Sequence, residues 1–408
     1  MKLFDNVIYF LSVLGPSVIT TMAGNDGGGV ITYSLAGARL GYAALFTLPF
    51  LTLLYALTQE MGSRIAIVTG KGLGDLIRES FGLQTSFAMF ILLLIANFGT
   101  LLTNVAALKA SSEMLGLPSV IIVLLSIVAT FLLITRTGYE RSQRVFLLGI
   151  VFYLAYVISA IMAKPDWSDA LKSLFIPKAN LLDADSFLLL VAVLGTTITP
   201  WGQFFVQSYM KNKGVPVEKL RYAKFEAYLG AFLSNFFTFF MMVATAATLF
   251  VNNIGIGSGE EAALAIRPFA GEFSSVLFAV GLINAAIIGM TIVSLTSAYA
   301  FTEFFGFTGS LDESYNKGKT FYIIFLFNAI LAAVLVITPF FPLFKIVLYT
   351  QSLNGILLPV FLFFILKIVN NKELMGKYVN GKIYNVFAVA SSVLIVIAST
   401  LAVITTLK

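Results

Sequence analysis

Residues 21–32, TMAGNDGGGVIT, place one carboxylate and four glycines inside an apolar run that is otherwise suited to crossing a membrane. The run begins with FLSVLGPSVIT at residues 10–20. A carboxylate at the centre of a membrane helix costs about 2.5–3.5 kcal/mol, so such residues face a cavity or a partner. The stretch therefore predicts a helix that is broken for a functional reason.

The composition of the whole chain is that of an integral membrane protein. Of its 408 residues, 59% are hydrophobic and only 11% are charged, and the mean hydropathy is +0.94. Soluble domains carry roughly 25% charged residues. The net charge of +6 does not indicate nucleic-acid binding, because the basic residues lie in short loops between apolar stretches.

The absence of Cys and His restricts the chemistry that the chain can perform. It excludes disulfides, thiolate sites and imidazole sites. A metal must then be held by carboxylate, amide, hydroxyl, carbonyl, water or thioether ligands, a set that suits hard cations such as Mg²⁺, Mn²⁺, Ca²⁺ or Na⁺. Hydrolase and redox functions are disfavoured, and neither a cofactor nor a cleavable signal peptide is expected.

A transmembrane helix needs about 20 apolar residues, and the chain contains eleven stretches of roughly this length. The sequence therefore predicts an all-α protein with eleven transmembrane helices. The expected spans are 8–38, 42–62, 85–110, 118–135, 145–163, 186–212, 226–251, 273–300, 320–339, 343–368 and 383–406. Residues 66–84 are too polar to span and read as a short amphipathic helix at the cytoplasmic surface. Most Lys and Arg residues fall in alternate loops, which predicts a multi-pass plasma-membrane protein with its N-terminus inside and its C-terminus outside.

Two of these spans are interrupted by polar residues, glycine or proline. The first break runs from Gly24 to Gly29 and the second from Gly195 to Gln203, five spans later. Such a pair predicts two inverted five-helix repeats around a mid-membrane site, the LeuT-like architecture of secondary transporters. We expect a single transporter domain over residues 1–408, with repeats at 1–164 and 165–369 and an additional eleventh helix at 370–408.

Asp26 is the strongest candidate for a cation ligand. The sequence offers it no basic partner deep in another span, and Gly27, Gly28 and Gly29 are compatible with unwound backbone whose free carbonyls coordinate cations. In the second break, Pro200 leaves the carbonyl of Thr196 without its helical donor. The hydroxyls of Thr196, Thr197 and Thr199 either bind the ion or form hydrogen bonds to the backbone of their own helix. Trp201 is expected to pack against other helices or to act as a gate residue.

Further amides lie in other spans. Gln351 and Asn354 in the tenth span serve the site or join helices. Asn97, Thr100 and Asn104 share one face of the third span, which either lines a water path or packs. That face carries no acid, although a proton relay needs Asp, Glu or His. Glu60, Glu113 and Glu303 lie towards span ends and are expected to be solvated or paired there.

These motifs resemble those of the Nramp family of divalent metal transporters. Gly15, Pro16, Ala23 and Asp26 match the spacing of the family's first-span G-P…A-x-x-D motif, and residues 62–79 resemble its R-x-x-V-T-G-K-x-L motif. Residues 199–202, TPWG, fall where the family has M-P-H-N. The interval from Gln351 to Pro359 matches the family's tenth-span Q-x7-P motif. Glu303 resembles a glutamate near the cytoplasmic end of the family's eighth span.

The differences from the family motifs lie at its functional residues. The family's metal-binding Asn corresponds to Gly29, its metal-binding Met to Thr199 and its sixth-span His to Trp201. The acids that carry protons along its third span correspond to Leu101 and Asn104. Loss of the thioether removes the soft ligand, the smaller residues are expected to leave room for water on the ion, and Mg²⁺ dehydrates reluctantly.

The pattern resembles the magnesium-transporting branch of the Nramp relatives. It implies uptake of hydrated Mg²⁺, and also of Mn²⁺, without proton coupling. The expected location is a prokaryotic plasma membrane, and the expected functional unit is a monomer. The expected metal site comprises Asp26, Ala23, Gly29, Thr196, Thr199 and Gln351. The expected pathway or outer contacts are Asn25, Asn97, Asn104, Gln203 and Asn354.

Three other transport functions remain open from the residues. A sodium-coupled transporter of small solutes shares the broken-helix architecture. Proton-coupled Mn²⁺ or Fe²⁺ uptake is opposed by the loss of the motif's metal-binding Met, at Thr199, and by the absence of His. Uptake of a trivalent ion is opposed because only one carboxylate lies deep in a span. A membrane enzyme is disfavoured because no nucleophile and base pair is visible.

Overall fold

The computed structural model describes residues 9–177, 184–254, 271–338 and 343–406, and every regular element among them is helical. The first half contains α2 (Pro16–Ala23), α3 (Gly27–Leu40), α4 (Thr47–Thr69), α5 (Leu73–Met114), α6 (Ser119–Arg136), α7 (Gly138–Gly149), α8 (Leu154–Met162) and α9 (Trp167–Ser173). The second half contains α10 (Ala184–Thr197), α11 (Pro200–Lys213), α12 (Leu220–Thr245), α14 (Glu272–Phe305), α15 (Lys319–Ile337), α16 (Leu343–Val369), α17 (Lys372–Met375) and α18 (Lys382–Thr406).

Short irregular helices join several of these elements. They are the 3₁₀ turns η1 (Gly41–Phe46), η2 (Ile150–Tyr153), η3 (Val217–Lys219) and η5 (Gly376–Tyr378), and the π turn η4 (Ala246–Phe250). The turn η1 links α3 to α4 without a loop, but Gly41, whose φ is 58° and ψ −144°, interrupts the helical backbone between them.

Nine helical segments of the described residues are long and apolar enough to cross a membrane. The all-helical prediction is confirmed, but the count of eleven spans is not. The half-helix α2 is too short to count alone, and only Tyr384–Ala398 of α18 stands out as a shorter apolar helix. Two predicted span ends, residues 8 and 339, lie outside the described ranges.

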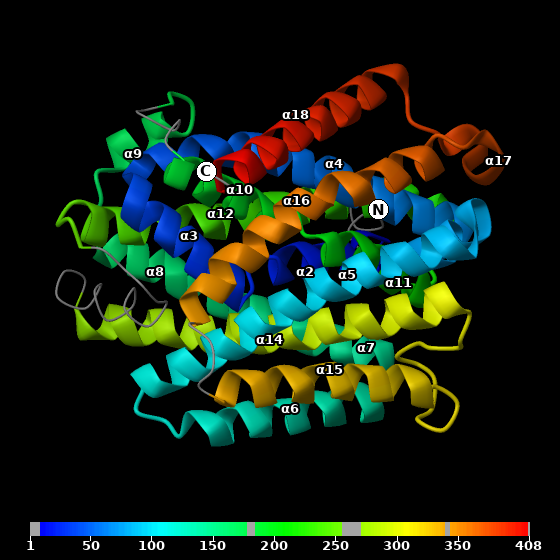
Figure 1. Cartoon of the computed structure of the whole chain (residues 1–408), viewed down its shortest axis with the longest axis horizontal. Coiled ribbons are helices and arrows are strands. Elements are labelled where there is room, and N and C mark those ends of the chain that lie inside the picture. The colour runs from blue at the N-terminus through cyan, green and yellow to red at the C-terminus, as the bar shows by residue number, and fades with distance from the viewer. Residues whose placement is uncertain (1–8, 178–183, 255–270, 339–342, 407–408) are drawn as a thin grey trace.

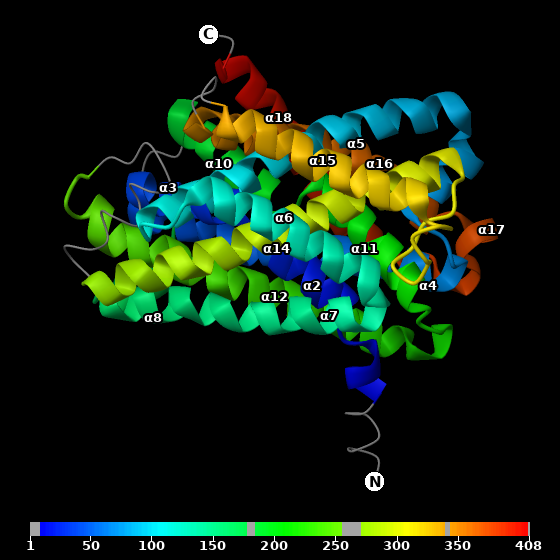
Figure 2. The same ribbon diagram turned by 90° about the horizontal axis from the view of Figure 1, so that it is seen from below.

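The two predicted broken helices form the centre of the bundle. Every residue of α2 is buried, as are Pro200–Met210 of α11. Helix α12 packs against α2, α3 and α4, while α10 packs against α16 and α14 against α5. In Figure 1, α2, α3 and α11 lie between α16 and α18 on one side and α14, α15 and α6 on the other. The turned view in Figure 2 shows α8, α12 and α7 along another side.

The segment after α4 matches the predicted short helix only in part. Residues 66–69 still belong to α4, and the chain becomes helical again at Leu73. A kink at Gly82, whose φ is 82°, separates the first two turns of α5 from its membrane-spanning part. A positive φ is readily adopted by glycine, which explains why the direction changes at this residue. Leu73, Leu76 and Ile77 are buried, so these two turns are anchored against the bundle.

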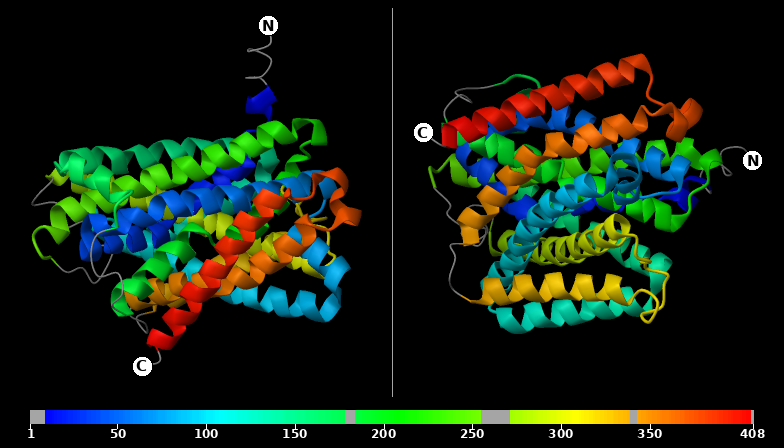
Figure 3. Two further views of the ribbon diagram at one scale, coloured as in Figure 1. Left: turned by 90° about the horizontal axis from the view of Figure 1, so that it is seen from above. Right: turned by 45° about the vertical axis from the view of Figure 1, so that its right-hand side comes forward.

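The outermost helices of the bundle are α18 on one edge and the pair α6 and α15 on the opposite one (Figures 1 and 3). Helix α18 packs on α16, α10 and α4, and α15 packs on α6, α5 and α14. Large apolar side chains of α6 and α18 are exposed, including Leu125, Val128, Val386 and Phe387. This distribution is expected of helices that face lipid.

Close contact between α10 and α16 gives the first prediction. A Cβ at Gly195 would lie 2.0 Å from the carbonyl oxygen of Gln351 and 2.4 Å from the amide nitrogen of Gly355, both backbone atoms of α16. We expect Gly195→Ala to destabilise the protein by about 1–3 kcal/mol, because the helices must separate. Thermal unfolding in detergent measures this.

The matched control is Gly381→Ala, since no atom lies within 4 Å of a Cβ at that position. Equal unfolding temperatures for the two variants would contradict the close helix contact at Gly195.

Candidate metal site

The first break is shorter than the sequence predicts. Helix α2 ends at Ala23 and α3 begins at Gly27, so only Gly24, Asn25 and Asp26 lie between them. Gly27, Gly28 and Gly29 form the first turn of α3, and the expectation of unwound backbone at these glycines is wrong. Asp26 is the N-cap of α3, and its Oδ1 accepts a hydrogen bond of 2.7 Å from the amide of Gly29.

The Asp26 carboxylate is buried and is held by amides. Its side chain is 1% exposed, and Oδ2 accepts a 2.7 Å hydrogen bond from Nδ2 of Asn104 on α5. Asn104 also accepts from the amide of Gly27 at 2.9 Å. None of the ion pairs among the described residues involves Asp26. The carboxylate therefore has no basic partner there, and neutral donors fix its orientation.

Gly27 and Gly28 provide close packing rather than space. A Cβ at Gly27 would lie 2.5 Å from the Cβ of Ala107, and a Cβ at Gly28 would lie 2.4 Å from Nε2 of Gln351 and 2.5 Å from Oγ1 of Thr103. The room for water expected from Gly29 and Thr199 stays a prediction, because these contacts concern only Gly27 and Gly28. These two glycines let α5 and α16 approach the start of α3.

The second break has the same local construction as the first. Helix α10 ends at Thr197 and α11 begins at Pro200, so the predicted break from Gly195 to Gln203 narrows to Ile198 and Thr199. Thr199 is the N-cap of α11 and accepts a 3.1 Å hydrogen bond from the amide of Gly202. In both breaks, an N-cap oxygen thus binds the amide of a glycine three residues later, which is the usual N-cap interaction.

The two breaks lie side by side. The hydroxyls of Tyr33 on α3 and Thr197 on α10 are 2.9 Å apart. A point at the Cβ position of Gly29 lies 2.7 Å from the carbonyl oxygen of Gly24, 3.2 Å from Oγ1 of Thr196 and 3.4 Å from Oδ1 of Asp26. We call these three atoms the oxygen cluster. Within the described part of the chain, Oγ1 of Thr196 has no hydrogen-bond partner although it is buried.

Of the remaining predicted site residues, Ala23 and Gln351 lie next to the first break. Ala23 is fully buried at the end of α2, directly before the break. Gln351 lies beside Gly28, where its Oε1 accepts from Asn354 at 3.0 Å and its Nε2 has no partner among the described residues. Asn354 also donates to Oγ1 of Thr100 at 2.9 Å.

Asn25 and Asn97 bind other helices instead of the cluster. Asn25 donates to the carbonyl of Ser234 on α12 at 2.8 Å and accepts from Thr238 at 2.9 Å. Asn97 donates to Ser297 on α14 at 3.0 Å. Asn25 thus fixes the first break to α12, and Asn97 joins α5 to α14.

A row of buried amides leads away from the second break along the contact between α4 and α11. The side chains of Gln59, Gln203 and Gln207 are all fully buried, and each has at least one amide atom without a partner in the described structure. Gln203 lies 3.5 Å from the hydroxyl of Thr58. The sequence analysis identified Gln203 but missed Gln59 and Gln207, although the spacing of four between Gln203 and Gln207 in an apolar helix could have indicated them.

This arrangement suits a hard cation. Its donors are a carboxylate, a carbonyl and a hydroxyl, and the carbonyl-bearing C-terminal ends of α2 and α10 meet at the breaks, where their partial negative charge favours a cation. No group of three or more acidic side chains that could hold a metal occurs among the described residues. The chemistry therefore depends on Asp26 and on neutral oxygen atoms.

Glu226 is a buried acid that the sequence analysis missed. It lies on α12, and its Oε1 accepts from the amides of Gly15, Ser17 and Val18 at 2.8, 3.0 and 3.1 Å. These amides form the N-terminus of α2. Nearby, Nζ of Lys213 donates to the carbonyls of Val13 and Leu14. The position of Glu226 at the start of an apolar stretch could have indicated a buried acid. Its partner Gly15, however, lies 211 residues away in the chain.

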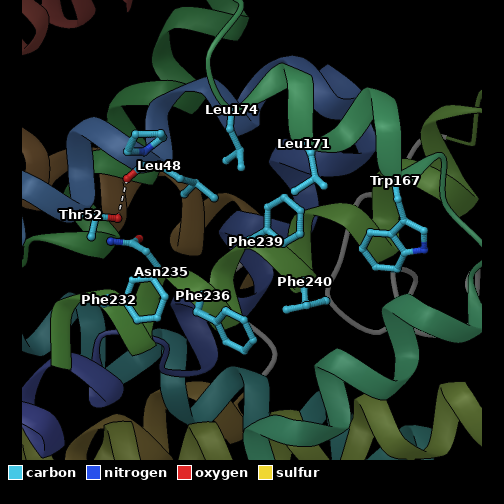
Figure 4. Close-up of a pocket in the computed structure, with 11 residues that line it drawn as sticks. Leu48, Thr52, Trp167, Leu171, Leu174, Phe232, Asn235, Phe236, Phe239 and Phe240 are labelled. Atoms are coloured by element: carbon cyan, nitrogen blue, oxygen red, sulfur yellow. Dashed lines mark hydrogen bonds between the residues drawn. The ribbon is translucent and has the colours of Figure 1, made fainter. Parts of the chain in front are cut away.

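A separate groove of about 560 Å³ lies on another face of the bundle (Figure 4). Phe232, Phe236 and Phe240 of α12 and Trp167 of α9 provide much of its wall. None of its lining residues is charged, and the oxygen cluster does not contribute to it. This groove is therefore not the candidate metal site.

Two half-helix pairs meeting at a buried carboxylate define a membrane transporter of the broken-helix class. The chain belongs to the Nramp family: the family profile, described as natural resistance-associated macrophage protein-like, matches residues 17–405. Members of this family are transporters and not enzymes, and the same holds for this chain.

The divalent metal cation transporter MntH of Pectobacterium carotovorum is 26% identical over 379 residues, which cover 91% of this chain and 89% of the relative. MntH of Bacillus subtilis is 25% identical over 98% of this chain and 93% of the relative.

Solved structures show the same fold. The manganese transporter of Eremococcus coleocola superposes with a TM-score of 0.75 at 18% identity, covering 96% of this chain and 85% of that one. MhsT in complex with L-phenylalanine gives a TM-score of 0.62 at 13% identity, covering 97% of each chain. The fold is therefore shared with a manganese transporter and with a protein that binds L-phenylalanine, which confirms an all-helical, LeuT-like fold but does not identify the substrate.

Asp26 gives the second prediction. Asp26→Asn keeps the size of the side chain and removes its charge, so we expect Mn²⁺ binding in detergent to weaken by more than about tenfold, or ~1.4 kcal/mol. Isothermal titration calorimetry measures the change. The control is Glu218→Gln, which neutralises an exposed carboxylate on η3. Unchanged affinity in Asp26→Asn would contradict the assignment of Asp26 as a ligand.

Proposed function

We propose that this protein takes up Mg²⁺, and also Mn²⁺, across the plasma membrane of a prokaryote by alternating access and without coupling to protons. The observation that carries the proposal is the oxygen cluster of Gly24, Asp26 and Thr196 at the meeting point of the two broken helices. The relatives named as divalent metal cation transporters and as a manganese transporter support a divalent ion as the substrate.

The donor set supports a hard ion. Thr199 stands where the Nramp motif has a metal-binding methionine, and its hydroxyl caps α11. Oxygen donors without a thioether favour Mg²⁺ and Mn²⁺ over softer ions such as Cd²⁺. Gln351 supplies a further carboxamide beside Gly28. Mg²⁺ usually keeps several waters and binds through one or two carboxylates, so a single acid is sufficient here.

The groups around Asp26 support uncoupled transport. Asn104 occupies a position at which the family carries a proton-transferring acid, and it donates a hydrogen bond to Asp26. An amide cannot accept and release a proton near neutral pH. The membrane potential would then drive uptake. It supplies a free energy of about 2.3 kcal/mol per charge for each 100 mV, and a divalent ion receives twice this amount.

Alternating access is supported by the closed arrangement around the cluster. Asp26, Thr196 and Thr199 are each at most 2% exposed. Glu226 and Lys213 bind the backbone at the start of α2 and so close this side of the bundle. We assign this side to the cytoplasm because the loops there are rich in Lys and Arg. Residues 1–164 and 165–369 are the two proposed inverted repeats, and residues 370–408 form the proposed extra helix.

A single chain supplies every proposed ligand, and a monomer is the proposed functional unit.

Restoring a soft ligand gives the third prediction. Thr199→Met is expected to increase the affinity for Cd²⁺ by about tenfold, or ~1.4 kcal/mol, because a thioether replaces the hydroxyl. The substitution also removes the N-cap bond to Gly202, which costs ~1 kcal/mol of stability. Thr199→Ser keeps the cap and serves as the control in Cd²⁺ titrations. A Cd²⁺ affinity equal to that of the control would show that residue 199 does not contact the ion.

Transport itself gives the fourth prediction. In proteoliposomes held at a fixed negative internal potential, we expect Mg²⁺ and Mn²⁺ to enter while an internal pH dye stays constant. Asp26→Asn should abolish both fluxes. Mn²⁺ entry accompanied by acidification would support ordinary proton-coupled uptake instead. Inhibition of the flux by an amino acid, with no metal entry, would favour the solute transporter of the same fold.

A further inference from the structure

Two adjoining pockets at the basic end of the bundle have different characters. The basic end is defined by Arg64, Lys211, Lys213, Arg221, Lys224 and Lys382. One pocket, of about 400 Å³, is polar and is lined by residues of α4, α12 and the segment before α18, including Arg64, Arg221 and Lys224. The other, of about 690 Å³, is lined by Leu53, Leu57 and Phe387, with Lys382 as its one charged residue. Gly381 and Tyr384 line both pockets, so the two adjoin there.

The polar pocket carries an excess of positive charge. Glu60 is the only acid among its lining residues, and Arg64 neutralises it through a 3.0 Å ion pair. The Glu60 carboxylate also accepts a 2.7 Å hydrogen bond from Tyr384. Arg221 and Lys224 are exposed and take part in none of the ion pairs among the described residues. Lys224 instead lies 5.5 Å above the ring of Tyr384.

The apolar pocket extends from this charged region along the lipid-facing surface. Leu53 and Phe387 are each about half exposed, on α4 and α18 respectively. Arg64 lies eleven positions after Leu53 on α4, a distance of about 16 Å along a helix. Cationic side chains therefore stand at one end of a hydrocarbon-lined groove, which matches the polarity of a phospholipid lying along the bundle.

We infer that an anionic phospholipid binds here, with its phosphate between Arg221 and Lys224 and one acyl chain between α4 and α18. Basic pockets between membrane helices on the cytoplasmic side recognise such headgroups. A free phosphate would leave the apolar groove unused, and a zwitterionic lipid would bring its own cation to the basic side chains. The bound lipid joins α12, α4 and α18 through residues that lie outside the metal site.

Lipid binding is tested on the full chain in detergent by native mass spectrometry and thermal unfolding. The probes are phosphatidylglycerol, phosphatidylcholine and sn-glycerol 3-phosphate. We expect phosphatidylglycerol to bind at least tenfold more tightly than phosphatidylcholine and to raise the unfolding temperature. Glycerol 3-phosphate should have no effect. Equal binding of the two lipids, or an equal effect of glycerol 3-phosphate, would overturn the inference.

Two variants test the two parts of the site separately. Arg221→Gln with Lys224→Gln should abolish the preference for phosphatidylglycerol. Lys317→Gln with Lys319→Gln, which removes two exposed basic charges far along the chain, should retain it. Gly381→Trp should block binding without changing charge, because Gly381 lines both pockets and a Cβ there would meet no protein atom within 4 Å. A preference retained in the Arg221 and Lys224 double variant would overturn the inference whether or not Gly381→Trp folds.

Discussion

The buried carboxylate of Asp26 is the constraint on which the centre of this bundle depends. A charge at this depth is tolerated only if other groups replace its water. Here the amides of Gly29 and Asn104 do so, and each requires a specific arrangement of the chain. The Gly29 amide is free because α3 begins at Gly27, and Asn104 can reach the carboxylate because glycines let α5 approach.

The two broken helices bring complementary atoms together at one point. Ends of α2 and α10 present carbonyls, and the starts of α3 and α11 are capped by Asp26 and Thr199. Both caps stabilise their half-helices, and the cap oxygen of Asp26 also belongs to the oxygen cluster. Asp26 therefore maintains the fold and forms part of the candidate ion site, which explains why the interruption of the first helix is not a defect of the fold.

Several features of this site could be predicted from the sequence because they depend on single residues in an apolar background. Asp26, Thr199 and the two breaks were of this kind. The exact helix ends could not be predicted, since glycine permits both unwound and helical backbone and only the contacts with Ala107, Thr103 and Gln351 select the helix. Glu226 was missed because its partners, the amides of α2, belong to a distant part of the chain. The count of eleven spans stays a prediction, because the short 3₁₀ turn η1 between α3 and α4 leaves a helical stretch too long for one span and too compact for length alone to divide.

The most direct test of the account is a crystal structure of the protein soaked with Mn²⁺ and measured at the manganese absorption edge. We predict an anomalous peak within about 2.5 Å of Oδ1 of Asp26, next to the carbonyl of Gly24 and the hydroxyl of Thr196. Mg²⁺ added in excess should displace it. A peak elsewhere in the bundle, or none at the oxygen cluster while Mn²⁺ is transported, would contradict the assignment of this cluster as the ion site.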